Sequence, residues 1–268
     1  MSYGETEAVR GIDLEVTTGE IFAFLGPNGA GKTSTVEILE GYRKRTGGAV
    51  SVLGEDPEHA GRAWRDRIGI VLQSNSLDPY LTVRESIELY AGYFSHPRAV
   101  EETIALVGLE EKADERARKL SGGQQRRLDV GMALVGDPEL LFLDEPTTGF
   151  DPSARRQFWD VIAGLRDLGK TIFLTTHYMD EAERLADRVT IIAGGGIAGL
   201  ASTRRKRSSM SSFACRCRSS STICSNARWL RWCTRKRSRF ATTSSISRSS
   251  RPGHAATAAC SSGEAKAR

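Results

Sequence analysis

The apolar and polar positions of the chain change their period several times, and these changes predict its strands. From Ile12 through Leu14 to Val16, apolar residues alternate with polar ones, which predicts a half-buried strand. Unbroken apolar runs at 21–25 and 140–143 predict strands that are buried on both faces. Further strands are expected at 49–53, 68–72, 171–175 and 188–193, with one more beginning at 197–199.

Helical spacing of apolar residues follows several of these strands. It predicts helices over 33–40, 152–168 and 178–186. From about 74 to 135 strand signals are few, and helices are expected over 81–94, 98–107 and 124–135. Apolar strands that alternate with helices indicate a parallel sheet with crossover helices. The fold class is therefore α/β, with a helical insertion over about 74–135.

The segment between the first buried strand and its helix carries the strongest chemical signal. Glycines let backbone N–H groups turn toward an anion, and a helix start adds partial positive charge. Lys32 can reach the β- and γ-phosphates of a nucleotide, and the Thr33 hydroxyl can ligate Mg²⁺. A chance match in a Gly-rich turn is expected in about 1% of chains of this length. We interpret the segment as a nucleotide-phosphate site, formed by Gly26, Pro27, Asn28, Gly29, Ala30, Gly31, Lys32, Thr33 and Ser34.

Two further motifs accompany this loop. The apolar strand at 140–143 ends in two carboxylates: Asp144 can hold Mg²⁺, and Glu145 can orient and deprotonate an attacking water. A strand ending in a polar turn is the alternative, but the neighbouring phosphate loop favours catalysis. Ser121, Gly122 and Gly123 open a helix, either as an ordinary N-cap or as a second phosphate site. One chain has no obvious need for two such sites.

In this order the motifs resemble those of ATP-binding subunits of ABC transporters, over roughly residues 3–200. The resemblance implies a P-loop NTPase core with a small antiparallel β subdomain, and it implies ATP and Mg²⁺ as cofactors. It also implies a head-to-tail homodimer that holds two ATP molecules, each between one subunit's phosphate loop and the other's Ser121 motif. The matching motifs are GPNGAGKT at 26–33, Gln73, LSGGQQ at 120–125, LFLDEP at 141–146, GFDP at 149–152 and His177.

The resemblance also assigns roles to individual residues. Glu145 is similar to the general base and His177 to the γ-phosphate sensor. Gln73 matches a catalytic residue that is also associated with Mg²⁺. Thr33 and Asp144 are expected to be associated with Mg²⁺ as well. The Ser121, Gly122 and Gly123 motif would contact the γ-phosphate across the dimer, Asp151 would lie in the loop at that interface, and Tyr3 would stack on adenine.

Two departures from the family pattern stand out. Phe150 occupies a position where the family usually has Leu. Family members also carry a first strand before the aromatic that Tyr3 resembles, and here that strand is expected to be missing. Adenine stacking and the edge of the antiparallel subdomain both depend on that region.

Charge divides the chain into an acidic part, 1–203, and a basic part, 204–268. The basic part holds 16 of the 38 Lys and Arg residues but one of the 33 acids, so it carries +15 and the rest −10. It also contains all five cysteines, and an ATPase domain without cysteine fits a reducing compartment. We expect 204–268 to be disordered, either as a basic arm for nucleic acid or anionic lipid or as a frameshifted sequence, which we favour.

We expect no signal peptide from the start of this sequence, and it contains no apolar run of the roughly 20 residues that span a bilayer. We therefore expect a peripheral subunit at the cytoplasmic face of the membrane, docked on a separate permease through the region from Gln73 to Phe94. The stretch 81–85 resembles exporter-type subunits for drugs or other hydrophobic compounds. The alternatives are a soluble ABC ATPase acting on nucleic acid or ribosomes, and an inactive product. No specific nucleic acid partner is expected.

Overall fold

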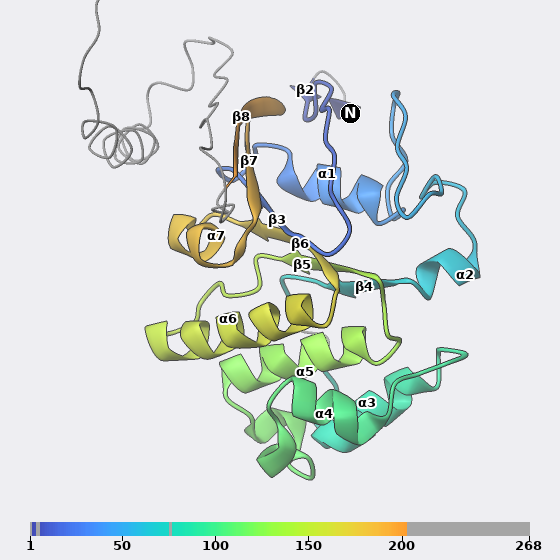
Figure 1. The fold of residues 1–268 in the computed structure, drawn as a ribbon, viewed down its shortest axis with the longest axis vertical. Helices are drawn as coiled ribbons and strands as arrows, with labels where there is room; N and C mark the ends of the chain where they lie inside the picture. The colour runs from blue at the N-terminus through green and yellow to red at the C-terminus, as the bar shows by residue number, and fades with distance from the viewer. Residues whose placement is uncertain (1, 4–5, 75–76, 203–268) are drawn as a thin grey trace, which may run out of the picture. The chain divides into compact units, whose positions relative to one another are not determined.

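A six-stranded sheet forms the centre of the computed structural model, which describes residues 2–3, 6–74 and 77–202 (Figure 1). The strand order is β4-β5-β6-β3-β7-β8, and every pairing is parallel except the antiparallel pair β7–β8. A separate antiparallel hairpin pairs β1 (Ser2–Tyr3) with β2 (Thr6–Glu7). The sheet strands are β3 (Ile21–Leu25), β4 (Ile68–Val71), β5 (Leu140–Asp144), β6 (Thr171–Thr176), β7 (Arg188–Ala193) and β8 (Gly196–Ser202).

Seven α-helices occur in the described part of the chain, and local chemistry fixes several of their starts. Asp151 caps the longest helix by accepting from the backbone N–H groups of Ser153 and Ala154, and Pro152 fills its first position. None of the described helices is long and apolar enough to cross a lipid bilayer. The helices are α1 (Lys32–Leu39), α2 (Arg62–Arg65), α3 (Val83–Ala91), α4 (Val100–Leu106), α5 (Gly122–Leu134), α6 (Pro152–Asp167) and α7 (Met179–Leu185).

The predicted helices and most predicted strands are confirmed within a few residues. Among the described residues, the short helix α2, the hairpin β1–β2 and two 3-10 helices, Glu110–Lys112 and Ala117–Lys119, lack a counterpart among the predicted elements. The expectations for 204–268, including those for the five cysteines, lie outside the described residues.

Aromatic side chains form the core between the sheet and α1. Phe22 and Phe24 of β3 and Phe142 of β5 surround Phe173 of β6, with ring centroids 5.4–5.7 Å apart. Because side chains alternate along a strand, the intervening residues of β3 face the opposite side of the sheet. Figure 1 shows α1 on one side of the sheet and α5 and α6 on the other. All five residues of β3 are buried, as a strand covered on both faces requires.

Two predicted strands are wrong. Ile12, Leu14 and Val16 are half-buried and alternate with exposed residues as expected, but 12–16 has no strand conformation. The predicted strand at 49–53 is reduced to one isolated bridge between Val52 and Glu55. Burial of alternate residues was predicted correctly, but a strand also needs a hydrogen-bonded neighbour, and the two segments do not pair with each other.

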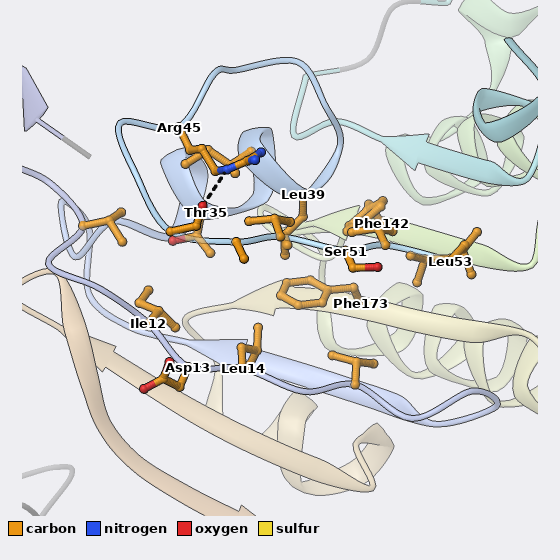
Figure 2. A pocket seen from close by; sticks show the side chains of 18 of the residues that line it. Ile12, Asp13, Leu14, Thr35, Leu39, Arg45, Ser51, Leu53, Phe142 and Phe173 are labelled. Carbon is orange, nitrogen blue, oxygen red and sulfur yellow. Dashed lines mark hydrogen bonds between the residues drawn. The ribbon is translucent and has the colours of Figure 1, made fainter. Parts of the chain in front are cut away.

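A cavity of about 470 Å³ lies between these two segments. Figure 2 shows Ile12 and Leu14 on one side of it and Ser51 and Leu53 on the other, with the Phe173 ring between them. Its lining includes Thr35 on α1 but neither the carboxylates after β5 nor the Ser121 motif. This cavity is therefore separate from the candidate chemistry described next.

Candidate functional site

The carboxyl ends of the parallel strands gather the candidate residues at one edge of the sheet. In the ladder, Leu25 of β3 stands opposite Thr176 of β6, and Thr175 stands opposite Asp144 of β5. The phosphate loop follows β3, Glu145 follows β5, and His177 follows β6. Since β6 lies between β3 and β5, it brings together segments that are more than a hundred residues apart in sequence. Ligands of open α/β sheets bind at such carboxyl edges.

The phosphate loop owes its shape to glycines that no other residue could replace without strain. Gly31 has φ +101°, and a Cβ there would lie 2.5 Å from the carbonyl oxygen of Ala8. A Cβ on Gly26 would lie 2.6 Å from the carbonyl oxygen of Ile192. Gly31 is also the N-cap of α1, and no described side chain caps this helix. The loop is thus held tightly against its surroundings, while the start of α1 is left to another hydrogen-bond acceptor.

Lys32 is buried at the centre of the loop, with 6% of its surface exposed. Its Nζ donates to the carbonyl oxygen of Gly26 at 2.8 Å and lies 3.3 Å from Oε1 of Glu145. Glu145 in turn places Oε2 3.0 Å from Nδ1 of His177. One carboxylate therefore joins the phosphate-loop lysine to the histidine, and the structure brings these three predicted site residues together.

The backbone at Glu145 is unusual. Its φ is +43°, a region that residues other than glycine seldom occupy. Its N–H donates to Thr175, both to the side-chain oxygen at 3.0 Å and to the carbonyl oxygen at 3.1 Å. The Thr175 hydroxyl also donates to Oδ1 of Asp144. Strain held by surrounding hydrogen bonds is typical of functional positions.

The Ser121 motif lies at the start of α5 and makes mainly local contacts. The Ser121 hydroxyl accepts from the Gln124 N–H at 3.3 Å, and the Gln124 side chain accepts from the Ser121 N–H at 2.9 Å. This is a capping box, so the N-cap interpretation is correct. Ser121 and Gly122 are exposed. The Ser121 hydroxyl retains its own proton for donation to a further acceptor.

The remaining predicted residues are less constrained. Thr33 and Gln73 are exposed, and Asp151 is an exposed helix cap whose pKa is lowered by the N–H groups of Ala154 and Ser153. Tyr3 lies in β1, and its side chain is outside the described part of the structure.

Sequence reasoning missed three residues that shape the site. Thr175 donates to the Asp144 carboxylate and accepts from the backbone N–H of Glu145. Glu40, at the end of α1, has a pKa raised to about 7, chiefly by burial and then by the charges of Asp144 and Glu37. Arg126 is buried on α5. The sequence contains a signal for this residue, because Arg126 lies four and eight positions before the buried Val130 and Leu134 and so falls on the buried face of the helix. A cation on a buried face needs hydrogen-bond or charge partners.

The sequence profile described as ABC transporter matches residues 9–148. The chain belongs to the ABC transporter family. Among its curated relatives, Nod factor export ATP-binding protein I of Paraburkholderia xenovorans is 45% identical over 199 residues, covering 72% of this chain and 66% of the relative. The protein of the same name from Sinorhizobium fredii is 46% identical, covering 72% and 58%. The chain thus spans less than two thirds of these relatives.

Solved ABC cassettes share the fold. A dimeric ATP-binding cassette in a post-hydrolysis state, bound to ADP and Pi, superposes with a TM-score of 0.67 at 25% identity, covering 76% of this chain and 95% of that one. A nucleotide-free ATP-binding cassette from an ABC transporter gives 0.67 at 22% identity, covering 75% and 88%. This confirms the α/β P-loop fold class, with a mixed and mostly parallel sheet.

Proposed function

We propose that residues 1–203 form an ATPase domain that binds and hydrolyses ATP to energise a separate membrane permease. The observation that carries the proposal is the cluster of Lys32, Glu145 and His177, three groups with distinct chemistry that meet at the carboxyl edge of the sheet. Phosphoryl transfer asks a protein mainly for positioning and charge stabilisation. A buried cation and an imidazole that both contact one carboxylate can supply both.

Each group has a proposed role. Lys32 and the start of α1 bind the β- and γ-phosphates, which would draw the ammonium from the Glu145 carboxylate. Glu145 is then left to accept a proton from the attacking water, and His177 contacts the γ-phosphate. General base catalysis of this kind contributes about 10²–10⁴-fold in rate.

Mg²⁺ fits the donor set at this edge. Thr33, Gln73 and Asp144 offer hydroxyl, amide and carboxylate oxygens, the hard ligands that Mg²⁺ prefers. In the described part of the chain, no three His, Cys, Asp or Glu side chains gather into a metal site. This is compatible with Mg²⁺, which is usually held by one or two carboxylates together with substrate phosphates. Bound there, the ion would neutralise charge on the β- and γ-phosphates.

We propose further that the functional unit is a homodimer in which Ser121, Gly122 and Gly123 of one subunit face the ATP held by the phosphate loop of the other. The exposure of Ser121 and Gly122 supports this, as does the dimeric, ADP-bound state of one structural neighbour. Asp151 would then lie at the interface. Tyr3 is proposed to stack on adenine.

The names of the relatives, which are export ATP-binding proteins, support a permease partner and export as the direction of transport. We propose export of drugs or other hydrophobic compounds, with the subunit at the cytoplasmic face of the membrane. The region from Gln73 to Phe94 is proposed to face the permease.

Mixing two inactive variants tests the shared site. Lys32→Ala removes the phosphate lysine, and Ser121→Arg blocks the opposite face with a bulky cation. Each variant alone should lack Mg-ATPase activity, whereas a mixture should regain up to about half the wild-type rate per heterodimer, because one composite site remains intact. An inactive mixture in which light scattering detects heterodimers would contradict the shared site, and an inactive wild type reconstituted with its permease would contradict the function.

A further inference from the structure

Arg126 lies on α5, and its side chain reaches the catalytic edge of the sheet. Only 3% of its surface is exposed. Its guanidinium donates to three backbone carbonyls: through Nε to Pro146 at 3.2 Å, through Nη2 to Asp144 at 3.0 Å, and through Nη1 to Leu72. A planar group with five donors in fixed directions can hold three separate chain segments in register.

These carbonyls occupy informative places in the chain. Asp144 and Pro146 flank Glu145, the residue with φ +43°. The guanidinium therefore holds the peptide unit that precedes Glu145 and the peptide unit between Pro146 and Thr147. Leu72 directly precedes Gln73. One side chain on α5 therefore holds the backbone next to Glu145, the proposed base, and next to Gln73, a proposed Mg²⁺-associated residue.

The ion pair of Arg126 is a weaker contact than these hydrogen bonds. Nη1 lies 3.6 Å from Oδ2 of Asp129, beyond hydrogen-bond distance. Burial raises the pKa of Asp129 to about 6 against the opposing effect of Arg126. The carbonyl contacts, rather than the carboxylate, are the well-formed partners of the guanidinium.

Arg127, the next residue on α5, provides an internal contrast. Its guanidinium also donates to carbonyls, Gly108 at 2.8 Å and Val107 at 3.5 Å, but these lie at the end of α4 and away from the site. Two adjacent arginines thus make the same kind of contact to different regions.

We propose that Arg126 is a positioning residue for ATP hydrolysis, which holds the Glu145 backbone and the segment before Gln73 in the geometry of the reaction and links both to the helix that begins at Ser121. This inference rests on the proposed function. Its consequence is specific: loss of the guanidinium lowers the rate of the chemical step and leaves ATP binding at the phosphate loop intact, because Lys32 and Gly31 lie outside its contacts.

The test compares four full-length variants. Arg126→Gln/Asp129→Asn removes the carbonyl contacts without leaving an unpaired buried charge. Asp129→Asn alone keeps the guanidinium, Arg127→Gln is the matched control, and Arg126→Lys keeps the charge but not the planar fork. The double variant should lose at least about 10-fold in kcat with KM for ATP changed less than about twofold. Arg126→Lys should recover only part of the loss, and the two remaining variants should match wild type.

Hydrogen exchange of the peptide covering 143–148 supplies a readout that needs no activity. It should be faster than wild type in the double variant and in Arg126→Lys, and unchanged in Arg127→Gln. Wild-type kcat in the double variant, equal losses in Asp129→Asn, or unchanged exchange at 143–148 would overturn the proposal. If the wild type itself hydrolyses no ATP, the proposed function has failed, and the exchange rates alone decide whether Arg126 holds this backbone. If the double variant does not fold, Arg126→Lys carries both measurements.

Discussion

The N-termini of α1 and α5 both contain glycines, but they differ in how they are capped. Glycines precede α1 and open α5, and neither helix has an acid in its first turn. At α5, the chain caps itself with the reciprocal hydrogen bonds of Ser121 and Gln124. At α1, Gly31 takes a left-handed conformation, and none of the described side chains caps the helix. The first helix start therefore has no described side-chain cap, whereas at the second the N–H groups of Ser121 and Gln124 are paired within the chain.

This difference suits the start of α1 to binding an anion and the start of α5 to contacting a ligand that is bound elsewhere. A helix start without a side-chain cap, beside a buried lysine, is an anion site in its own right. A capped helix start keeps its shape without a ligand and offers a hydroxyl proton and glycine backbone at the surface. The first arrangement is suited to capturing a nucleotide, and the second to recognising one that is already held elsewhere.

The largest expected effect comes from removing the cation at α1. Lys32→Ala should weaken Mg-ATP binding at least about 100-fold, because the loop would retain its amides but lose the buried charge that faces the β- and γ-phosphates. Isothermal titration with Mg-ATP measures the affinity, and circular dichroism checks the fold. A folded variant with wild-type affinity would remove the distinction between the two helix starts.

Glu145→Gln should separate binding from hydrolysis. The amide is isosteric with the carboxylate but cannot accept the proton, so hydrolysis should slow by at least about 10²-fold while ATP binding is retained. The variant should also accumulate as an ATP-bound dimer on gel filtration. Glu183→Gln, an acid on α7 outside the proposed site, is the control and should hydrolyse ATP normally. Wild-type turnover by Glu145→Gln would show that another group is the base.

Two glycine substitutions compare the helix starts directly. Gly31→Ala forces a side chain onto a residue with φ +101° and into the Ala8 carbonyl, so it should lower the free energy of unfolding by about 1–3 kcal/mol. Gly122→Ala meets no atom within 4 Å, and its cost should stay within about 0.5 kcal/mol. Urea denaturation measures both. Equal destabilisation would mean that the α5 start is as constrained as the α1 start.

The smallest effect concerns the other end of α1. Because the pKa of Glu40 is raised from 4.5 to about 7, its ionisation is less favourable in the folded than in the unfolded chain. The contribution of Glu40 to stability therefore falls as pH rises from about 4.5 to 7 and stays low above that. Glu40→Gln should raise the free energy of unfolding at pH 8 by about 1–2 kcal/mol after allowance for partial exposure, with a smaller gain at pH 5.

The Glu40 comparison is made in protein free of nucleotide and Mg²⁺, because a bound Mg²⁺ would offset the charge of Asp144 that contributes to the raised pKa of Glu40. Glu88→Gln, on the exposed face of α3, is the control and should show no such pH dependence. A gain for Glu40→Gln that is the same at pH 5 and pH 8 would contradict the raised pKa.

The sequence predicted the parts of the molecule that depend on local pattern. Apolar runs located β3 and β5, and the phosphate motif located Lys32 on the first turn of α1. It failed at 12–16, where alternation was real but a pairing partner was needed. The sequence could not reveal that β6 lies between β3 and β5. It also could not reveal that Thr175 and Arg126 hold the loop that contains Glu145, because their hydrogen bonds join residues 20 to 54 positions apart in the chain.

The central place of β6 has a consequence for biosynthesis. The phosphate loop is synthesised within the first fifth of the chain, yet β3 has no neighbour on either side until residues 171–176 and 188–193 are made. Pairing over such sequence distances is slow and occurs late in folding. Nascent chains that end before β6 would carry a complete phosphate motif without its sheet. Nucleotide capture should therefore appear abruptly with chain length, and would mark completion of the sheet rather than synthesis of the motif.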